Sequence, residues 1–352
     1  VVQQDARCCE HSAPHTRQLR SQAEACALAS ADVVVCTCSA AGDTRIGELR
    51  FSQVLVDEAG QTTEPETLIP LTLGAIRAVL IGDDKQLGPQ CSDVRAAQGG
   101  LSVSLFERLL QMGCPSTMLD VQYRMHPQLS LAPAHEFYKG KLHDAEGMRD
   151  KRTRNDVTFP WPVQGVPFFF LHHREGTKGG ETHATPSDTS WQNVSEAHLV
   201  LCVVSRLLSS GVTPKEVGVL TPYESQRRLL SRLIRGAGWS TEELEVANID
   251  AYQGREKGYM VLSLVRSSAR ADRVGFVGQA RRVNVAITRA QYGTVIVGDS
   301  TTLSTSSLWS SLLRGYTARG LVYAVPEGAD EQSVDDLSAL RPYQASTTAL
   351  AH

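Results

Sequence analysis

Short apolar runs recur along the chain from residue 31 onward and alternate with amphipathic segments. Runs rich in β-branched residues predict strands at 32–38, 53–58, 78–83, 167–171, 217–222, 245–250, 259–265 and 294–299. Apolar positions at helical spacing predict helices at 101–113, 196–211 and 223–236. Continuous apolar runs that feed helices are typical of strands buried on both faces of a parallel sheet. The pattern therefore predicts an α/β protein with parallel sheets.

The pattern also suggests a division into domains. Residues 139–195 are rich in Gly, Thr, Ser, Lys and Arg and weakly periodic, which predicts an exposed connection with one strand inside it. We place the boundary near 130, so that one α/β domain covers 31–130 and a second covers 131–326. Residues 1–30 are interpreted as the remnant of an insertion or linker, and the acidic, then polar, segment 327–352 as a mobile tail.

Composition narrows the function classes. The 352 residues are enough for two ordinary domains, and no run of about 18 apolar residues predicts a membrane span. The net charge of −3 means that a nucleic-acid partner would need a local basic channel. The eight cysteines form no C-x-x-C pair, which disfavours zinc and favours reduced thiols in a cytoplasmic protein. The first residue, Val1, begins a polar stretch, which suggests a fragment of a longer protein or an incomplete gene model.

Two predicted strands of the first domain end in polar side chains. In "VLVDEAGQ" (54–61) the strand ends in Asp57 and Glu58, at the edge where ligands bind in parallel sheets. Asp57 could hold Mg²⁺ through water and Glu58 could polarise an attacking water, although a solvated turn is the commoner explanation of such a pair. In "LIGDDKQLGP" (80–89), Gln86 could sense a phosphate, but for this stretch taken alone a plain β-turn is the favoured explanation.

Two further stretches have the residue types of a nucleotide site. "DVQYRMHPQLS" (120–130) offers Tyr123 as a flat face for a base and Arg124 as a fork for phosphate, or else a capped helix start with an incidental arginine. "IDAYQGREKG" (249–258) places Gly254 and Glu256 in a turn between two strands, where glycine permits close approach to an anion.

The stretch "GFVGQARRVNVAITRAQYGTVIVGDS" (275–300) places arginines beside an apolar helix face that leads into a core strand. The arginines are Arg281, Arg282 and Arg289. Because an unpaired buried charge is costly, they should either pair with carboxylates or bind an anion.

In this order and spacing, the motifs resemble those of superfamily 1 nucleic-acid helicases. More narrowly, they resemble the up-frameshift RNA helicase family of nonsense-mediated mRNA decay, through stretches that include "QTTEPETLIPLTLGA", "QYRMHPQLS", "LTPYESQ", "YQGREKG" and "RRVNVAITRAQYG". The resemblance covers roughly residues 25 to 325 and is highly specific. It implies the C-terminal part of a helicase core: two RecA-like domains with parallel sheets, the first incomplete at its N-terminal side.

The resemblance also assigns nucleotide-binding roles. Asp57 would be the Mg²⁺ ligand and Glu58 the general base, while Gln86 would sense the γ-phosphate. Arg289 would reach across the cleft between the RecA-like domains to the γ-phosphate, with Arg124 as a second phosphate-contacting arginine. The remaining residues, which would stack on adenine or close the pocket, are Tyr123, Gly254 and Glu256. The implied cofactors are ATP and Mg²⁺.

For RNA, the resemblance points to short polar stretches in each domain. These are Thr37, Cys38 and Ser39 in the first domain, and Thr221, Pro222 and Tyr223 in the second. Such contacts go largely to the nucleic-acid backbone, which suits a motor that moves along any sequence. The implied partners are single-stranded RNA and mRNA-decay factors, and no membrane.

One motif of the family is missing. No G-x-x-x-x-G-K-[ST] loop occurs in the sequence, and the glycine cluster "EGTKGGETH" (175–183) lacks its spacing. In the family this phosphate-binding loop lies upstream of the region matched here, so we expect an ATP hydrolase by family whose 352 residues alone are inactive. Two alternatives remain: a non-hydrolysing RNA-binding scaffold with a relic cleft, and a related DNA helicase that shares "QYRMHP" and "QGRE".

Overall fold

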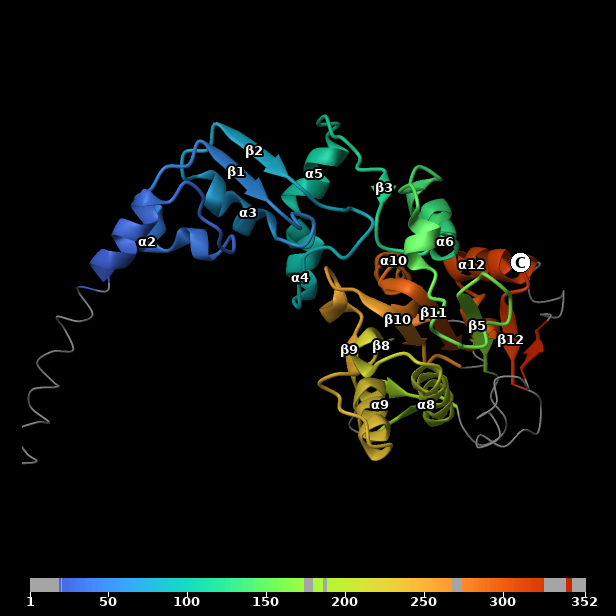
Figure 1. The fold of residues 1–352 in the computed structure, drawn as a ribbon. Helices are drawn as coiled ribbons and strands as arrows, with labels where there is room; N and C mark the ends of the chain where they lie inside the picture. Colours follow the sequence, from blue (N-terminus) through green and yellow to red (C-terminus); the bar gives the residue numbers. More distant parts are fainter. Residues whose placement is uncertain are drawn as a thin grey trace, which may run out of the picture. The chain divides into compact units, whose positions relative to one another are not determined.

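The computed structural model describes residues 19, 21–173, 180–185, 189–267, 274–325 and 340–343. They form two compact units (Figure 1). Unit 1 holds the described residues up to Asp84 together with Gly88–Ser116, and unit 2 holds Lys85–Leu87 and the described residues from Thr117 onward. The division of the chain into a domain at 31–130 and a second at 131–326 stays a prediction. Among the described residues, none of the helices combines the length and apolarity needed to cross a bilayer.

Unit 2 is built on a seven-stranded sheet in the order β13-β12-β5-β11-β10-β8-β9. Every neighbouring pair is parallel except β12 and β13. The strands are β5 (Phe168–His172), β8 (Val217–Thr221), β9 (Glu245–Asn248), β10 (Lys257–Ser263), β11 (Ala290–Gly298), β12 (Val322–Ala324) and β13 (Arg341–Pro342). The predicted α/β class with parallel sheets is therefore confirmed.

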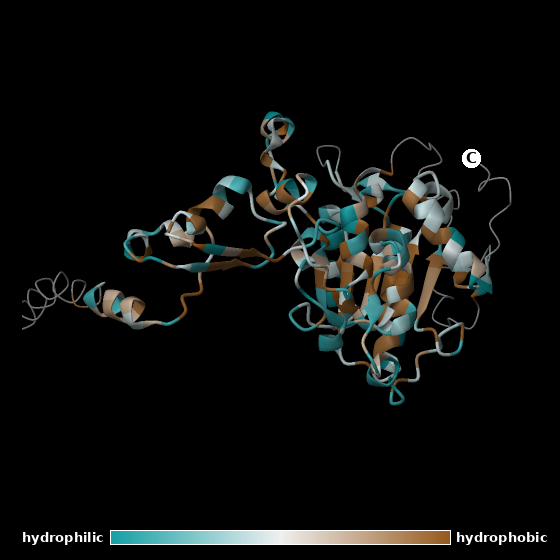
Figure 2. Cartoon of the chain, turned by 90° about the horizontal axis from the view of Figure 1, so that it is seen from above, coloured by the Kyte–Doolittle hydropathy of each residue, from teal (hydrophilic) through white to brown (hydrophobic). Residues whose placement is uncertain are grey.

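Helices cover both faces of this sheet (Figure 1). On one face, α8 (Val194–Ser209) and α9 (Glu224–Gly236) bury side chains such as Val200 and Leu230 against Val219 and Val261. On the other face, α6 (Pro127–Tyr138), α10 (Ala280–Ile287) and α12 (Ser307–Ala318) pack against the alternate strand residues, including Leu262. Because both faces are covered, the central strands are mostly apolar, as their largely brown colouring shows (Figure 2).

Shorter elements complete unit 2. They are β3 (Val121–Gln122), β4 (His143–Asp144), α7 (Met148–Arg152), β6 (Thr182–His183), β7 (Trp191–Gln192), η3 (Pro214–Glu216), η4 (Asp250–Tyr252), η5 (Gly275–Gly278) and α11 (Ser300–Leu303). Five of the strands and helices lie within 139–195, namely β4, α7, β5, β6 and β7. The prediction of one strand in that connection was wrong, because two-residue strands and a one-turn helix are too short to leave a periodic pattern.

Unit 1 contains a two-stranded parallel sheet in which β1 (Gln53–Val56) pairs with β2 (Arg77–Leu80). Leu55 and Val79 face each other in register and are both more than half exposed. The helical elements are η1 (Ala40–Gly42), α2 (Thr44–Gly47), α3 (Glu64–Leu71), α4 (Val94–Ala96), η2 (Ala97–Leu101) and α5 (Leu105–Gln111), and residues 21–30 are also helical.

The strand predicted at 32–38 is absent from the structure, in which these residues are irregular. Val33 and Val35 are 76% and 91% exposed. The β-branched composition favours a strand, but a strand also requires a neighbour for its backbone hydrogen bonds. In the part of unit 1 that the structure describes, β1 and β2 pair with each other, and residues 32–38 form no ladder with the open edge of either strand. Most of the predicted mobile tail, and residues 1–18 of the predicted remnant, lie outside the described residues.

Candidate functional site

In unit 1, the loops that follow β1 and β2 lie against each other. Ala59 N donates to Ile81 O at 2.7 Å. A Cβ added to Gly82 would lie 2.9 Å from Gly60 N, closer than real Cβ atoms come to backbone, so glycine is required there. The close approach holds together the carboxyl ends of two parallel strands, which is where ligands bind in α/β sheets.

Asp57 and Glu58 occupy this edge with exposed side chains. Glu58 has a φ of 51°, which is uncommon for a residue with a Cβ, and such strained residues tend to cluster at functional sites. Asp57 Oδ1 accepts a hydrogen bond from Glu58 N at 2.9 Å, and Glu58 Oε2 accepts one from Gln61 Nε2 at 2.9 Å. The backbone turn therefore fixes two adjacent carboxylates in different environments.

The carboxylates fit a weakly coordinated Mg²⁺. Among the described residues, no three His, Cys, Asp or Glu side chains gather as a metal site. Mg²⁺ commonly takes one or two protein carboxylates and fills its remaining positions with water and phosphate oxygens. An exposed Asp57 has the chemistry for that role, with one oxygen already oriented by Glu58 N.

Thr37, Cys38 and Ser39 form the turn before η1. Thr37 Oγ1 accepts a hydrogen bond from Ala40 N at 3.1 Å, and Ser39 Oγ donates to Glu66 Oε1 at 3.4 Å. Thr37 and Ser39 are exposed, whereas Cys38 is partly buried and its burial raises the pKa of the thiol. Two hydroxyls are thus accessible for contacts to a nucleic-acid backbone, and their contact with RNA stays a prediction.

In unit 2, Glu256 and Arg289 are brought together by the sheet. Glu256 directly precedes β10 and Arg289 directly precedes β11, and these strands are parallel neighbours with Lys257 opposite Ala290. Lys257 N donates to Arg289 O at 3.1 Å. Two segments that are distant in sequence therefore meet where their strands begin.

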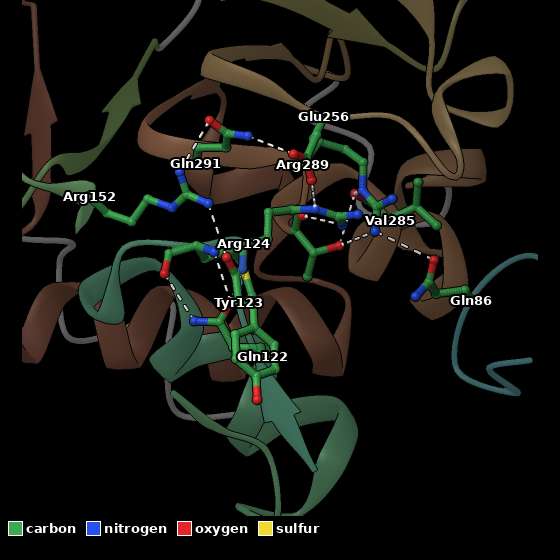
Figure 3. Close-up of polar contacts among 11 residues, drawn as sticks. Gln86, Gln122, Tyr123, Arg124, Arg152, Glu256, Val285, Arg289 and Gln291 are labelled. Atoms are coloured by element: carbon green, nitrogen blue, oxygen red, sulfur yellow. Dashed lines mark hydrogen bonds and ion pairs between the residues drawn. The ribbon is translucent and has the colours of Figure 1, made fainter. Parts of the chain in front are cut away.

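Arg124 joins this group from the segment between β3 and α6 (Figure 3). Its Nε lies 2.5 Å from Glu256 Oε2, and its Nη1 donates to Thr288 O at 3.2 Å. Gln291 Nε2 donates to the other Glu256 oxygen at 2.6 Å. Burial alone would raise the pKa of Glu256, but the hydrogen bonds from Arg124 and Gln291 and the positive charge of Arg124 hold that pKa below its usual range. The structure thus pairs two residues that the sequence assigned to one nucleotide pocket.

Tyr123 presents its ring to solvent from a fixed backbone. The residue is 69% exposed. Gln122 Oε1 accepts hydrogen bonds from Arg124 N at 2.9 Å and Met125 N at 2.8 Å, so the chain on one side of Tyr123 is held. An exposed aromatic ring on an ordered turn is suited to stacking on a planar ligand.

Arg289 is buried, at 2% exposure, beside α10. Three of its hydrogen bonds go to uncharged oxygens: Val285 O at 2.9 Å, Thr288 Oγ1 at 2.7 Å and Gln86 Oε1 at 3.4 Å (Figure 3). Arg282 differs, because it makes a two-point ion pair with Asp250 at 2.7 Å. Of the two explanations for these arginines, the carboxylate pair accounts for Arg282, and the anion stays a prediction for Arg289.

Gly254 lies in the turn between η4 and β10 with a φ of 74°. A Cβ added there would meet no atom within 4 Å, so the conformation and not the packing favours glycine. The backbone of this turn is exposed beside Glu256, as a residue closing a nucleotide pocket would require.

The predicted RNA-contacting residues of unit 2 lie at the carboxyl end of β8, and two of them are buried. Thr221 is 0% and Tyr223 4% exposed, whereas Pro222 is partly exposed. Burial raises the pKa of Tyr223. Its ring packs against that of Phe276, with centroids 6.2 Å apart, and Phe276 is 51% exposed. A buried Tyr223 ring offers no face to a base in this conformation, so its RNA contact stays a prediction while Phe276 offers the accessible ring.

Sequence reasoning missed Arg152, Gln291 and Phe276. Arg152 comes from the weakly periodic connection, and its role depends on contacts with segments far along the chain. Gln291 follows the recognised "ITRA" stretch by one residue, and an amide next to a strand start is not distinctive. Phe276 in "GFVG" had a usable signal, since an aromatic residue between two glycines is often exposed in a turn.

His126, next to Arg124, gives a prediction about stability. Its Nδ1 accepts a hydrogen bond from Gln128 N at 3.1 Å and so caps α6 in the neutral form. The pKa of His126 is lowered to about 4, mainly by burial and to a smaller extent by the positive charge of Arg149. The negative charge of Asp144 opposes this shift. The unfolded chain, with a pKa of about 6.5, therefore binds the proton before the folded one does, and stability is lost as pH falls from about 6.5 to 4.

The expected loss at pH 4.5 is about 2 to 3 kcal/mol, from about 1.4 kcal/mol per pKa unit. Urea unfolding of the wild-type chain and of His126→Asn should show it, because asparagine caps a helix without titrating in this range. Between pH 7.5 and 4.5, the free energy of unfolding should fall by about 2 to 3 kcal/mol more in the wild-type chain than in the variant. Parallel pH profiles for the two proteins would contradict the assignment.

Comparison with known proteins places these features in context. An AAA domain family model matches residues 101–301, and a second AAA domain model matches residues 3–92. The "Regulator of nonsense transcripts 1 homolog" of Neurospora crassa is 45% identical over 84% of this chain and 27% of its own length. The "ATP-dependent helicase NAM7" of Saccharomyces cerevisiae is 39% identical over 96% of this chain and 34% of its own length. The chain thus spans about a quarter to a third of the length of these relatives.

Among solved structures, "The structure of PRRSV helicase" aligns at 17% identity with a TM-score of 0.34, covering 70% of this chain and 34% of that one. The score is too low for a comparison of sites.

Proposed function

This chain belongs to the AAA-domain family, in the up-frameshift branch of the superfamily 1 helicases, and we propose that it is the C-terminal part of an ATP-dependent RNA helicase core. The observation that carries the proposal is the convergence in unit 2 of Gln86, Arg124, Glu256 and Arg289 at the starts of β10 and β11. These residue types are the ones that a triphosphate requires: guanidinium groups for charge, an amide as sensor and a carboxylate for the ribose or for arginine positioning.

We infer the following roles. Bound ATP with Mg²⁺ supplies the transferable γ-phosphoryl group. Asp57 would hold the cation, and Glu58, on its left-handed turn, would accept a proton from the attacking water. Arg289 and Arg124 place positive charge at the phosphate oxygens, and Arg124 exchanges Glu256 for phosphate when it does so. Tyr123 stacks on adenine, and Gly254 and Glu256 close the pocket.

The proposed polymer is single-stranded RNA, held by Thr37, Cys38 and Ser39 of unit 1 and by the region of Thr221, Pro222 and Tyr223 of unit 2. The relatives' names, "Regulator of nonsense transcripts 1" and its homologues, support a role in regulating nonsense transcripts. The proposal adds mRNA-decay factors as partners and a cytoplasmic location. Because the net charge is −3, binding must come from local basic side chains, and phosphate contacts should dominate.

RNA binding can be measured directly on this chain. Fluorescence anisotropy with a labelled oligouridylate of about 12 nucleotides should give weak binding that weakens about tenfold between 50 and 200 mM salt, as about three phosphate contacts require. The matched oligothymidylate should bind no more tightly than the RNA. Affinity indifferent to salt would contradict the RNA-binding part of the proposal, and preferential binding of the DNA would favour the related DNA helicase.

A further inference from the structure

Arg152 ends α7 and contacts two segments that carry proposed nucleotide-binding residues. Its Nη2 donates to Tyr123 O at 3.0 Å, and its Nη1 donates to Gln291 Oε1 at 3.4 Å. Its guanidinium also lies 5.7 Å from the centre of the Tyr292 ring, within the range of a cation–π interaction. One side chain thus spans a backbone carbonyl of the 122–126 segment and the first residues of β11 (Figure 3).

The contacts continue beyond Gln291. Gln291 Nε2 donates to Glu256 Oε1 at 2.6 Å, and the second Glu256 oxygen binds Arg124. The positive charge of Arg152 is also one of the causes that lower the pKa of Glu256. Arg152, Gln291, Glu256 and Arg124 therefore form a closed loop of contacts that begins and ends on the backbone around Tyr123.

Neighbouring basic residues behave differently. Arg149 and Lys151 are exposed on α7. Arg154 shares the Tyr292 ring with Arg152, at 5.2 Å from its centre, but it makes ion pairs with Asp156 and Glu216, both at 2.6 Å, and so links the connection to η3. Arg152 instead donates two hydrogen bonds to uncharged oxygens, one to Tyr123 O and one to Gln291 Oε1. A guanidinium fork fixes two acceptors at once, which a lysine ammonium does not do.

We propose that Arg152 is a positioning residue that sets the orientation of Tyr123 for the adenine of the bound nucleotide. The inference rests on the proposed function, in which Tyr123 meets adenine. Because Tyr123 is 69% exposed, its ring has few contacts of its own to hold it, and its orientation depends on its backbone. Gln122 fixes that backbone on the side toward Met125, and Arg152 fixes the carbonyl of Tyr123 itself.

The test uses this chain labelled with ¹³C at tyrosine ring positions, with the Tyr123 signal assigned by Tyr123→Phe. Four proteins are compared: the wild-type chain, Arg152→Ala, Arg152→Lys and Lys151→Ala. Each is titrated with ADP and, in a separate experiment, with pyrophosphate, whose binding is measured by ³¹P line broadening. ADP should shift the Tyr123 signal in the wild-type chain, and pyrophosphate should not. Arg152→Ala should weaken ADP binding about tenfold, because the hydrogen bond from Arg152 to Tyr123 O is lost and the Tyr123 ring becomes less ordered. The affinity for pyrophosphate should stay unchanged.

Arg152→Lys should resemble Arg152→Ala, and Lys151→Ala should resemble the wild-type chain. Equal ADP affinity in the wild-type chain and Arg152→Ala would overturn the inference, as would a parallel loss of ADP and pyrophosphate binding, which indicates general damage. If ADP binds to the wild-type chain but leaves its Tyr123 signal unchanged, the adenine assignment of the proposed function fails instead.

Amide hydrogen exchange measured without nucleotide then tests whether Arg152 orders the backbone around Tyr123, independently of ADP binding. The peptide covering 121–126 should exchange faster in Arg152→Ala than in Lys151→Ala, and equal rates would overturn the positioning role as well.

Discussion

Arg289→Ala is expected to lower the ATPase kcat by about a thousandfold or more, the effect typical of arginine fingers, in a chimera that supplies the missing phosphate loop. In the chimera, this chain follows the segment of Saccharomyces cerevisiae NAM7 that precedes its matched region. The 352 residues alone should show no ATPase above background, since their sequence has no G-x-x-x-x-G-K-[ST] loop. The size of the effect follows from the burial of Arg289, because a charge acts more strongly on a phosphate away from bulk water.

The control is Arg314→Ala, which removes an arginine from an exposed position of α12 and should leave turnover unchanged. Thermal unfolding of each variant distinguishes lost catalysis from lost folding, since Arg289 also donates to Val285 O and Thr288 Oγ1. Arg289→Lys keeps the charge but not the fork, and should recover little. A kcat within about fivefold of the wild-type chimera in a folded Arg289→Ala protein would exclude the arginine-finger role, whose usual effect is far larger.

The parallel sheet of unit 2 could be predicted because burial on both faces leaves a direct trace in the sequence. The runs at 217–222, 259–265 and 294–299 are apolar at nearly every position, and they became β8, β10 and β11. The run at 32–38 has the same composition and is irregular, so composition alone did not separate a strand from an exposed segment. What separates them is the presence of a neighbouring strand, which is a property of the fold.

The candidate site also has a part that the sequence predicts and a part that depends on the fold. Recognised motifs supplied Glu256, Arg124 and Arg289, and the family resemblance implied the role of each. Their mutual contacts depend on the register of β10 against β11, which places Lys257 opposite Ala290. Gln291 meets Glu256 through that register, and Arg152 contacts both Gln291 and Tyr123 O from α7, so no local pattern in the sequence marks them. Burial of Tyr223 under Phe276 is likewise a matter of packing that the "LTPYESQ" stretch does not reveal.

Glu58→Gln is expected to reduce hydrolysis in the same chimera about a thousandfold while leaving ATP affinity within about twofold, as loss of a general base requires. The amide keeps the size and shape of the carboxylate but cannot take a proton from water. The backbone should tolerate the change, because the hydrogen bond from Glu58 N to Asp57 Oδ1 does not involve the substituted group. An amide oxygen can still accept from Gln61 Nε2, as the carboxylate does at 2.9 Å.

Steady-state ATPase with and without RNA gives kcat, and a fluorescent ATP analogue gives the affinity of each protein. Glu48→Gln, at an exposed position of unit 1, makes the same chemical change away from the strand edge and should behave like the wild-type chimera. A variant that hydrolyses ATP normally would remove Glu58 from the role of base. A wild-type chimera that binds RNA but hydrolyses no ATP, with Glu58→Gln and Arg289→Ala indistinguishable from it, would favour the non-hydrolysing scaffold over the ATPase, because neither side chain would then contribute to turnover.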